Sequence, residues 1–103
     1  MLVRIADGYH IVAAQSPGGL VPMRVGIIGG TGVVAFADYP EGEEYGTEPK
    51  IRVYRGAFEL KVILELEGEW SGRPLVSVLY QACSDTECLA PMTVELDVAI
   101  DRA

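Results

Sequence analysis

The chain has 103 residues, half of them apolar, and its 15 acidic against 8 basic side chains give a net charge of −7. This length suits one domain with one hydrophobic core, since single domains typically run to ~100–150 residues. The acidic charge argues against nucleic acid as a partner. The apolar runs fall far short of the ~20 residues of a membrane helix, so we expect no direct membrane insertion of this segment. The opening residues are too few and too polar for a signal peptide, so we expect any export signal to have been removed or to lie outside this chain.

The first half of the chain predicts short strands separated by turns that contain glycine and proline. Residues 9–15, 20–28, 33–39 and 51–54 are rich in apolar side chains, and we expect them to be extended. Residues 16–19, Ser-Pro-Gly-Gly, form a turn signal. Residues 38–49 are interpreted as a polar loop rich in glycine and glutamate, and a loop of that length in a small domain is often functional.

The second half of the chain is more regular. Residues 57–67 alternate with a period of two, which is typical of a half-buried strand. A turn over residues 68–74 leads to a second strand at 75–83, whose apolar residues on both faces predict a central position. Residues 92–100 alternate again, and we expect the three strands to form an antiparallel meander. The face of 57–67 expected to be buried carries Phe58, Leu60, Val62, Leu64 and Leu66.

About seven antiparallel strands in a chain of this length predict an all-β fold of the immunoglobulin-like β-sandwich type, with a small barrel as the alternative. Trp70 lies in the predicted 68–74 turn, where we expect it to close one end of the core rather than to be an exposed contact residue. His10 lies beside Tyr9 on a predicted strand, and we expect it to be a partly buried structural histidine.

Residues 30–35, Gly-Thr-Gly-Val-Val-Ala, match the pattern of a dinucleotide-binding loop. That loop binds phosphate only when a helix follows it, because the pyrophosphate lies at the N-terminus of the helix. Here β-branched and aromatic residues follow, and Pro40 comes soon after. We therefore expect a glycine-rich hairpin turn with positive φ between two strands.

Cys83 and Cys88 are the only two cysteines, and four residues separate them. A disulfide that closes so short a loop would stabilise the fold by only ~2 kcal/mol. The carboxylates of Asp85 and Glu87 would raise the pKa of nearby thiols. The residues alone leave three interpretations open, namely dithiol–disulfide exchange, a passive local disulfide, or binding of a soft metal such as Cu(I) by the cysteines with Met92 or His10.

The stretch Tyr80-Gln81-Ala82-Cys83, with Cys88 and Pro91 after it, resembles the signature of the N-terminal periplasmic domain of the thiol:disulfide interchange protein family DsbD. The resemblance covers residues 7–100, and the spacing of the cysteines is similar to that of the family's disulfide-corrector relatives. Four earlier segments match in the same order. They are Asp7-Gly8-Tyr9-His10, Tyr39-Pro40-Glu41-Gly42, Glu43-Glu44-Tyr45-Gly46 and Val53-Tyr54-Arg55-Gly56.

The resemblance implies one immunoglobulin-like thiol–disulfide exchange domain over residues 1–103, monomeric and forming one part of a larger membrane protein. It implies a location in the periplasm or at the extracytoplasmic face of the inner membrane. Electrons would arrive from a transmembrane electron-donor domain and leave to thioredoxin-fold proteins, among them a disulfide isomerase and a protein of cytochrome c maturation. The domain would be part of a protein-disulfide reductase and would need no cofactor or metal.

The resemblance also assigns roles to individual residues. Cys88 would form the mixed disulfide with partners and Cys83 would resolve it, while Tyr45 and Glu44 in the cap loop would gate access to the sulfurs. The alternative to this redox role is a non-catalytic immunoglobulin-like binding or spacer domain with a local structural disulfide. Residues expected to support the site are Tyr80, Gln81 and Asp85.

Overall fold

The computed structural model describes residues 1–14, 20–46 and 51–97 of the chain. These residues are all-β and form eleven strands. The described part of the chain contains no helix that is long and apolar enough to cross a membrane. The strands are β1 (Leu2–Arg4), β2 (His10–Val12), β3 (Arg24–Ile28), β4 (Thr31–Asp38), β5 (Glu43–Tyr45), β6 (Ile51–Tyr54), β7 (Ala57–Glu59), β8 (Lys61–Ser71), β9 (Leu75–Tyr80), β10 (Ala82–Cys83) and β11 (Met92–Asp97).

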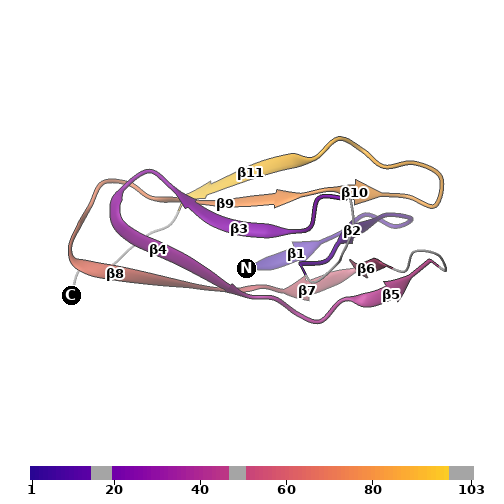
Figure 1. Cartoon of the computed structure of the whole chain (residues 1–103), viewed down its shortest axis with the longest axis horizontal. Helices are drawn as coiled ribbons and strands as arrows, with labels where there is room; N and C mark the ends of the chain where they lie inside the picture. The colour runs from indigo at the N-terminus through magenta and orange to yellow at the C-terminus, as the bar shows by residue number, and fades with distance from the viewer. Residues whose placement is uncertain (15–19, 47–50, 98–103) are drawn as a thin grey trace.

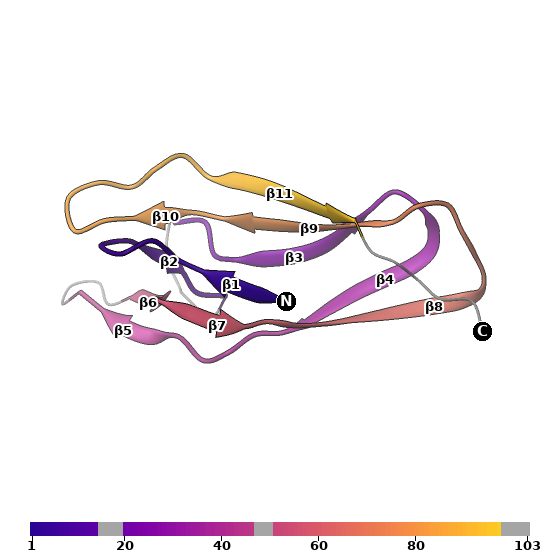
Figure 2. The same ribbon diagram turned by 180° about the vertical axis from the view of Figure 1, so that it is seen from behind.

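All strand pairs are antiparallel, and they form sheets in the orders β1-β7, β10-β2-β6-β5, β11-β9-β3 and β4-β8. Figures 1 and 2 show two layers, with β11, β9 and β3 in one and β4, β8, β7, β6 and β5 in the other. This arrangement is consistent with the predicted β-sandwich. The sheet β10-β2-β6-β5 joins the two layers at one end of the molecule.

The core lies between the layers and is made mostly of aliphatic side chains. Leu60 is fully buried at the junction of β7 and β8, as the period-two pattern predicts. Phe58, Val62 and Leu64 pack against the same cluster, whereas Leu66, in the middle of β8, is exposed. The buried cluster consists of Ile11, Ala13, Met23, Tyr54, Leu60, Val76 and Val78.

One long two-stranded ribbon folds back on itself to build much of both layers. The ladder of β4 with β8 continues past its end as the ladder of β3 with β9, since Thr31 pairs with Ser71 and Ile28 pairs with Leu75. Positive φ at Gly29, Gly30 and Gly72 bends the ribbon there. The predicted glycine turn therefore has positive φ, but β3 and β4 pair with different strands instead of forming a hairpin. In the described chain the element that follows this turn is strand β4 and not a helix.

Two predicted strands are each divided in the structure. The predicted strand 57–67 is interrupted at Leu60, where the chain leaves the sheet of β1 and joins that of β4. The predicted strand 75–83 is interrupted at Gln81, where the chain passes from the sheet of β11 to that of β2. Before this interruption β9 is the central strand of its sheet, as predicted.

Other boundaries differ as well. The predicted turn at 68–74 is shorter, because β8 runs on to Ser71 and carries Trp70, which is half-buried. Strands β9 and β11 pair as expected, but the predicted meander is wrong because β8 pairs with β4. The predicted loop 38–49 contains β5, and β1 was not predicted. Residues 15–19, 47–49 and 98–100 of the predicted segments lie outside the described part of the chain.

Candidate functional site

The two cysteines form a disulfide at the end of the molecule where β10, β2, β6 and β5 join the layers. Cys83 closes β10 and is 2 % exposed, whereas Cys88 lies in the following loop and is exposed. The two residues face each other in an antiparallel bridge, so the disulfide closes a short hairpin. One sulfur therefore belongs to a core residue and the other to a surface residue.

The hairpin between the cysteines is organised by Ser84. Its Oγ accepts hydrogen bonds from the backbone N–H groups of Thr86 and Glu87, both at 3.2 Å. Its own N–H donates to the carbonyl of Glu87 at 2.7 Å. Just beyond Cys88, the N–H of Leu89 donates to the carbonyl of Ala82 at 2.8 Å. These bonds fix the backbone on both sides of the exposed cysteine.

Tyr45 connects strand β5 to the disulfide hairpin. Its hydroxyl donates a 2.6 Å hydrogen bond to Oδ1 of Asp85, which lies between the two cysteines. Its ring packs against the imidazole of His10, with the centroids 4.2 Å apart and the ring planes tilted by 40°. His10 is 4 % exposed and pairs directly with Cys83 across β2 and β10, and side chains directly opposite in a sheet lie on the same face. Tyr45 thus contacts two neighbours of the disulfide, Asp85 within the hairpin and His10 opposite Cys83.

Arg55 and Glu43 complete the group of side chains around Tyr45. The guanidinium of Arg55 lies 5.2 Å from the centre of the Tyr45 ring, within the range of a cation–π contact. Its Nε is 2.9 Å from Oε1 of Glu43. We call these five residues the cap cluster: His10, Glu43, Tyr45, Arg55 and Asp85.

Two pKa values in the cap cluster are shifted. Burial, followed by the positive charge of Arg55, lowers the pKa of His10, while Asp85 and Glu43 act in the opposite direction. The hydrogen bond to Asp85 is the main cause that raises the pKa of Tyr45. Both shifts favour the uncharged form of the side chain.

The backbone before β5 is held by two hydrogen bonds. The hydroxyl of Tyr54 donates to the carbonyl of Pro40 at 2.8 Å, and Nη1 of Arg52 donates to the carbonyl of Gly42 at 2.6 Å. Gly42 is buried, and a Cβ there would come within 2.6 Å of the Cβ of Ala13. Glycine is therefore needed where the chain approaches β2 before it turns to Tyr45.

Three further predicted site residues lie outside the cap cluster, namely Gln81, Tyr80 and Glu44. Gln81 holds the base of the hairpin, since its Nε2 donates to the carbonyl of Leu89 at 3.2 Å and its Oε1 accepts from the N–H of Val21 at 2.9 Å. The hydroxyl of Tyr80 points to Sδ of Met92 at 3.8 Å. Glu44 is exposed on β5 and pairs with Arg52 in the sheet.

The sequence did not single out Arg55 or Glu43 as site residues, and it assigned His10 a structural role. All three residues stand within segments that carried the family resemblance, and that resemblance was the only signal for them in the sequence. Among residues 1–14, 20–46 and 51–97, no three His, Cys, Asp or Glu side chains form a group that could hold a metal ion. Met92, a candidate Cu(I) ligand, has its sulfur next to Tyr80.

Among the hollows in the described surface, two lie near this site and another lies away from it. A polar pocket of about 210 Å³ beside the disulfide is lined by Asp7, His10, Arg55 and Asp85 among others. An apolar groove of about 760 Å³ begins at Leu89, next to Cys88, and runs along β1 and β11. A third hollow of about 470 Å³ lies between the end of β4 and the start of β8, and neither cysteine lines it.

In comparisons with models of protein families, with curated proteins and with solved structures, the chain matches none of them.

Proposed function

We propose that this domain carries out thiol–disulfide exchange through Cys83 and Cys88. The observation that supports the proposal best is the unequal burial of the pair, with Cys88 exposed and Cys83 held in the core. A disulfide that staples a small domain usually joins distant segments, because a longer closed loop gives more stabilisation. This disulfide closes a short hairpin at the surface, and Cys88 is the member of the pair that lies exposed to a second protein.

The proposed reaction begins with the reduced pair. The Cys88 thiolate attacks the disulfide of an oxidised partner, forms a mixed disulfide and releases the partner's other sulfur as a thiolate. The Cys83 thiolate then attacks Sγ of Cys88, which releases the second partner thiolate and restores the Cys83–Cys88 disulfide. Two electrons pass from the domain to the partner, and reduction of the domain by a donor dithiol is the reverse sequence.

Tyr45 is the proposed gate. Its ring and its hydrogen bond to Asp85 hold β5 against the disulfide hairpin. By holding the hairpin in place, these contacts would restrict access to the buried Cys83 until a partner displaces them, while Cys88 stays exposed. The carboxylate of Asp85 also disfavours a nearby thiolate, which would keep the reduced pair largely protonated while no partner is bound.

The partners and location that fit this chemistry are those implied by the resemblance to DsbD. We propose a thioredoxin-fold acceptor and a transmembrane electron-donor domain, and a periplasmic setting. The observed Cys83–Cys88 disulfide and all-β fold agree with such a module. An oxidising compartment is where a protein disulfide persists.

Trapping of mixed disulfides tests the proposal. The Cys83→Ser variant leaves Cys88 free and should accumulate a mixed disulfide with an oxidised thioredoxin-fold protein, detected by non-reducing electrophoresis and intact mass. The matched Cys88→Ser variant should accumulate none, and circular dichroism should show that both remain folded. Trapping by Cys88→Ser alone would reverse the two roles. If neither folded variant forms a mixed disulfide, the pair is a local structural disulfide and the domain a binding or spacer module.

A further inference from the structure

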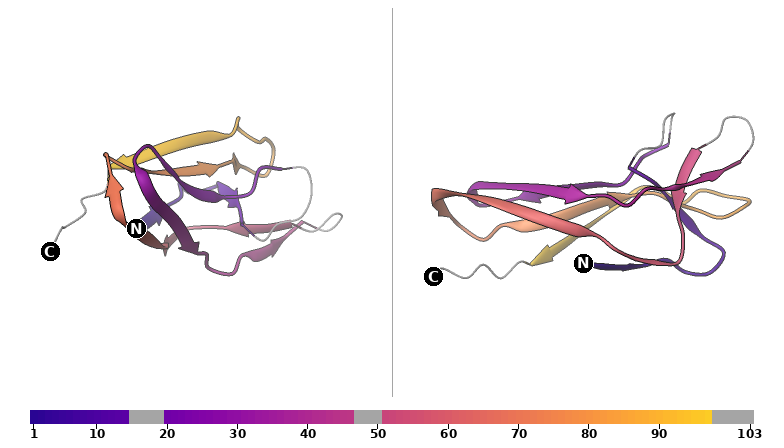
Figure 3. Two further views of the ribbon diagram at one scale, coloured as in Figure 1. Left: turned by 60° about the vertical axis from the view of Figure 1, so that its left-hand side comes forward. Right: turned by 90° about the horizontal axis from the view of Figure 1, so that it is seen from below.

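The apolar groove that begins at Leu89 lies between two strand edges. Strand β11 is at the edge of the sheet β11-β9-β3, and β1 has only β7 beside it in the described structure. Figure 3 shows β1 and the end of β11 on the same side of the molecule. The inner faces of β9 and β11 form one wall of the groove, with Tyr80, Val94 and Leu96. The open core side of the sandwich is therefore accessible between β1 and β11.

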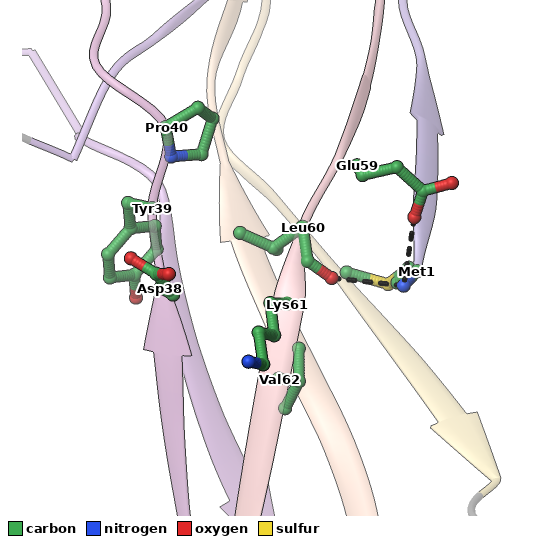
Figure 4. A pocket seen from close by; sticks show the side chains of 8 residues that line it. All are labelled: Met1, Asp38, Tyr39, Pro40, Glu59, Leu60, Lys61 and Val62. Atoms are coloured by element: carbon green, nitrogen blue, oxygen red, sulfur yellow. Dashed lines mark hydrogen bonds and ion pairs between the residues drawn. The ribbon is translucent and has the colours of Figure 1, made fainter.

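The edge of β1 forms the other wall, and its pairing shows which backbone groups face the groove. Met1 exchanges hydrogen bonds with Leu60, and the N–H of Ile5 donates to the carbonyl of Gly56. In an antiparallel ladder, alternate residues direct their N–H and C=O groups away from the partner strand. Leu2 and Arg4 therefore present their backbone groups outward, away from β7. Figure 4 shows Met1 held against Glu59 and Leu60 at the start of β1, which fixes this edge.

These features specify the kind of occupant. An edge with outward N–H and C=O groups is satisfied by another extended backbone, and apolar walls take apolar side chains at alternate positions. Among the described residues that line the groove, Arg4 is the only one with a charged side chain, and the amino terminus of Met1 is positive as well. The chain as a whole carries −7, which disfavours a second copy of the chain. The occupant's inward side chains should therefore be apolar and uncharged, and its outward side chains, which meet the acidic surface, should be neutral or basic.

We propose that this groove binds an extended, neutral-to-basic segment of the exchange partner as an added strand on the edge of β1. The groove meets the site at Leu89, the residue after Cys88, so a segment bound there places a cysteine near its end beside the exposed sulfur. The identity of the occupant as the exchange partner rests on the proposed function. The groove's preference for an extended apolar segment does not depend on the proposed function. This preference follows from the edge of β1 and the apolar walls.

The test uses Cys83→Ser protein and two disulfide probes. One is a synthetic octapeptide with valine at alternate positions, lysine and threonine between them, and a terminal cysteine in a mixed disulfide with thionitrobenzoate. The other is the disulfide of cysteine with thionitrobenzoate, which is too small to occupy the groove. Attack by the Cys88 thiolate transfers the peptide or the cysteine to Cys88 and releases thionitrobenzoate, whose absorbance gives the rate.

Val94→Asp places a charge in the groove wall, and Phe36→Asp makes the same kind of change at an exposed apolar residue on the distant β4–β8 face. We expect Val94→Asp to slow the peptide reaction by about tenfold, as loss of one well-buried apolar contact would, and to leave the small probe unchanged. Phe36→Asp should change neither rate. Equal peptide rates in all three proteins would overturn the proposal.

A separate measurement keeps the two proposals distinguishable. A fluorescent octapeptide with serine in place of cysteine should bind the wild-type protein, by anisotropy, more tightly than it binds Val94→Asp. If neither thiol probe reacts but this peptide binds, the redox function fails and the groove stands. If the peptide does not bind, the groove proposal fails. A dimer in sedimentation that Val94→Asp dissociates would show a second copy as the occupant, which also overturns it.

Discussion

The end of the molecule that carries the disulfide and the end where the ribbon folds back differ in how they are held together. At the disulfide end, strands of two to four residues are tied by side-chain contacts such as Tyr45 with Asp85 and His10. At the other end, β4 and β8 form a long regular ladder, and glycines make the bend. The outer face of that ladder exposes Val34, Phe36 and Ile63.

This difference indicates how stability and function are divided. Backbone ladders and buried aliphatic residues hold the ribbon. The shifted pKa values of His10 and Tyr45 lie at the disulfide end. Changes in the ribbon should therefore alter the free energy of unfolding, and changes in the cap cluster should alter the reactivity of the disulfide.

Leu60→Ala should have the largest effect on stability. Leu60 is fully buried where the chain passes from β7 to β8, so its truncation leaves a cavity that the core cannot easily fill. The expected loss in free energy of unfolding is about 2–5 kcal/mol, measured by urea denaturation. Ile63→Ala, three residues away on the exposed face, should lose much less, and an equal loss in both would contradict the placement of the core.

Gly72→Ala tests the bend of the ribbon. Gly72 has φ of +87°, and a Cβ there would lie 2.9 Å from the Cα of Gly30 in the crossing turn. We expect a loss of about 1–3 kcal/mol from backbone strain in the same denaturation experiment. Gly68→Ala is the matched control, because a Cβ there meets open space. A neutral Gly72→Ala would mean that the turns are farther apart than described.

Tyr45→Phe should change reactivity and lower the free energy of unfolding only by the small net contribution of one hydrogen bond. It removes the hydrogen bond to Asp85 and retains the ring on His10. Loss of one net hydrogen bond predicts that a small thiol reduces the disulfide about two- to tenfold faster. Tyr80→Phe is the control, since the Tyr80 hydroxyl contacts only the weak acceptor Sδ of Met92 among the described hydrogen bonds. Equal acceleration in both variants would argue against Tyr45 as the gate.

The dependence of stability on pH should be the smallest effect. The pKa of His10 is lowered in the folded protein, so the fold prefers neutral imidazole. Its contribution to stability is present above the ordinary pKa of ~6.5 and is lost as the pH falls from there toward the folded pKa. His10→Gln should reduce the slope of unfolding free energy against pH in this window. An unchanged slope would show that other groups cause it.

The sequence predicts the ribbon better than the site for a physical reason. Alternation in 57–67 and 92–97 is a local signal that marks which face of a strand is buried, and the structure confirms it at Leu60 and Leu96. Strand pairing is not local, which is why β8 was expected beside β9 and lies beside β4. The contact of Tyr45 with His10 joins residues 35 positions apart in sequence, and neither residue's local pattern indicates it. The cysteines marked the end of the molecule that carries the disulfide, and the family resemblance alone placed Tyr45 beside them.

The reduction potential of the Cys83–Cys88 pair, measured by alkylation and intact mass across defined redox buffers, tests the central claim most directly. Circular dichroism in each buffer should show that the domain stays folded. A working exchange module should give a value near −200 to −270 mV, the range of known exchange proteins. A value well below about −300 mV, or reduction only together with unfolding, would make the disulfide structural and contradict the proposed function.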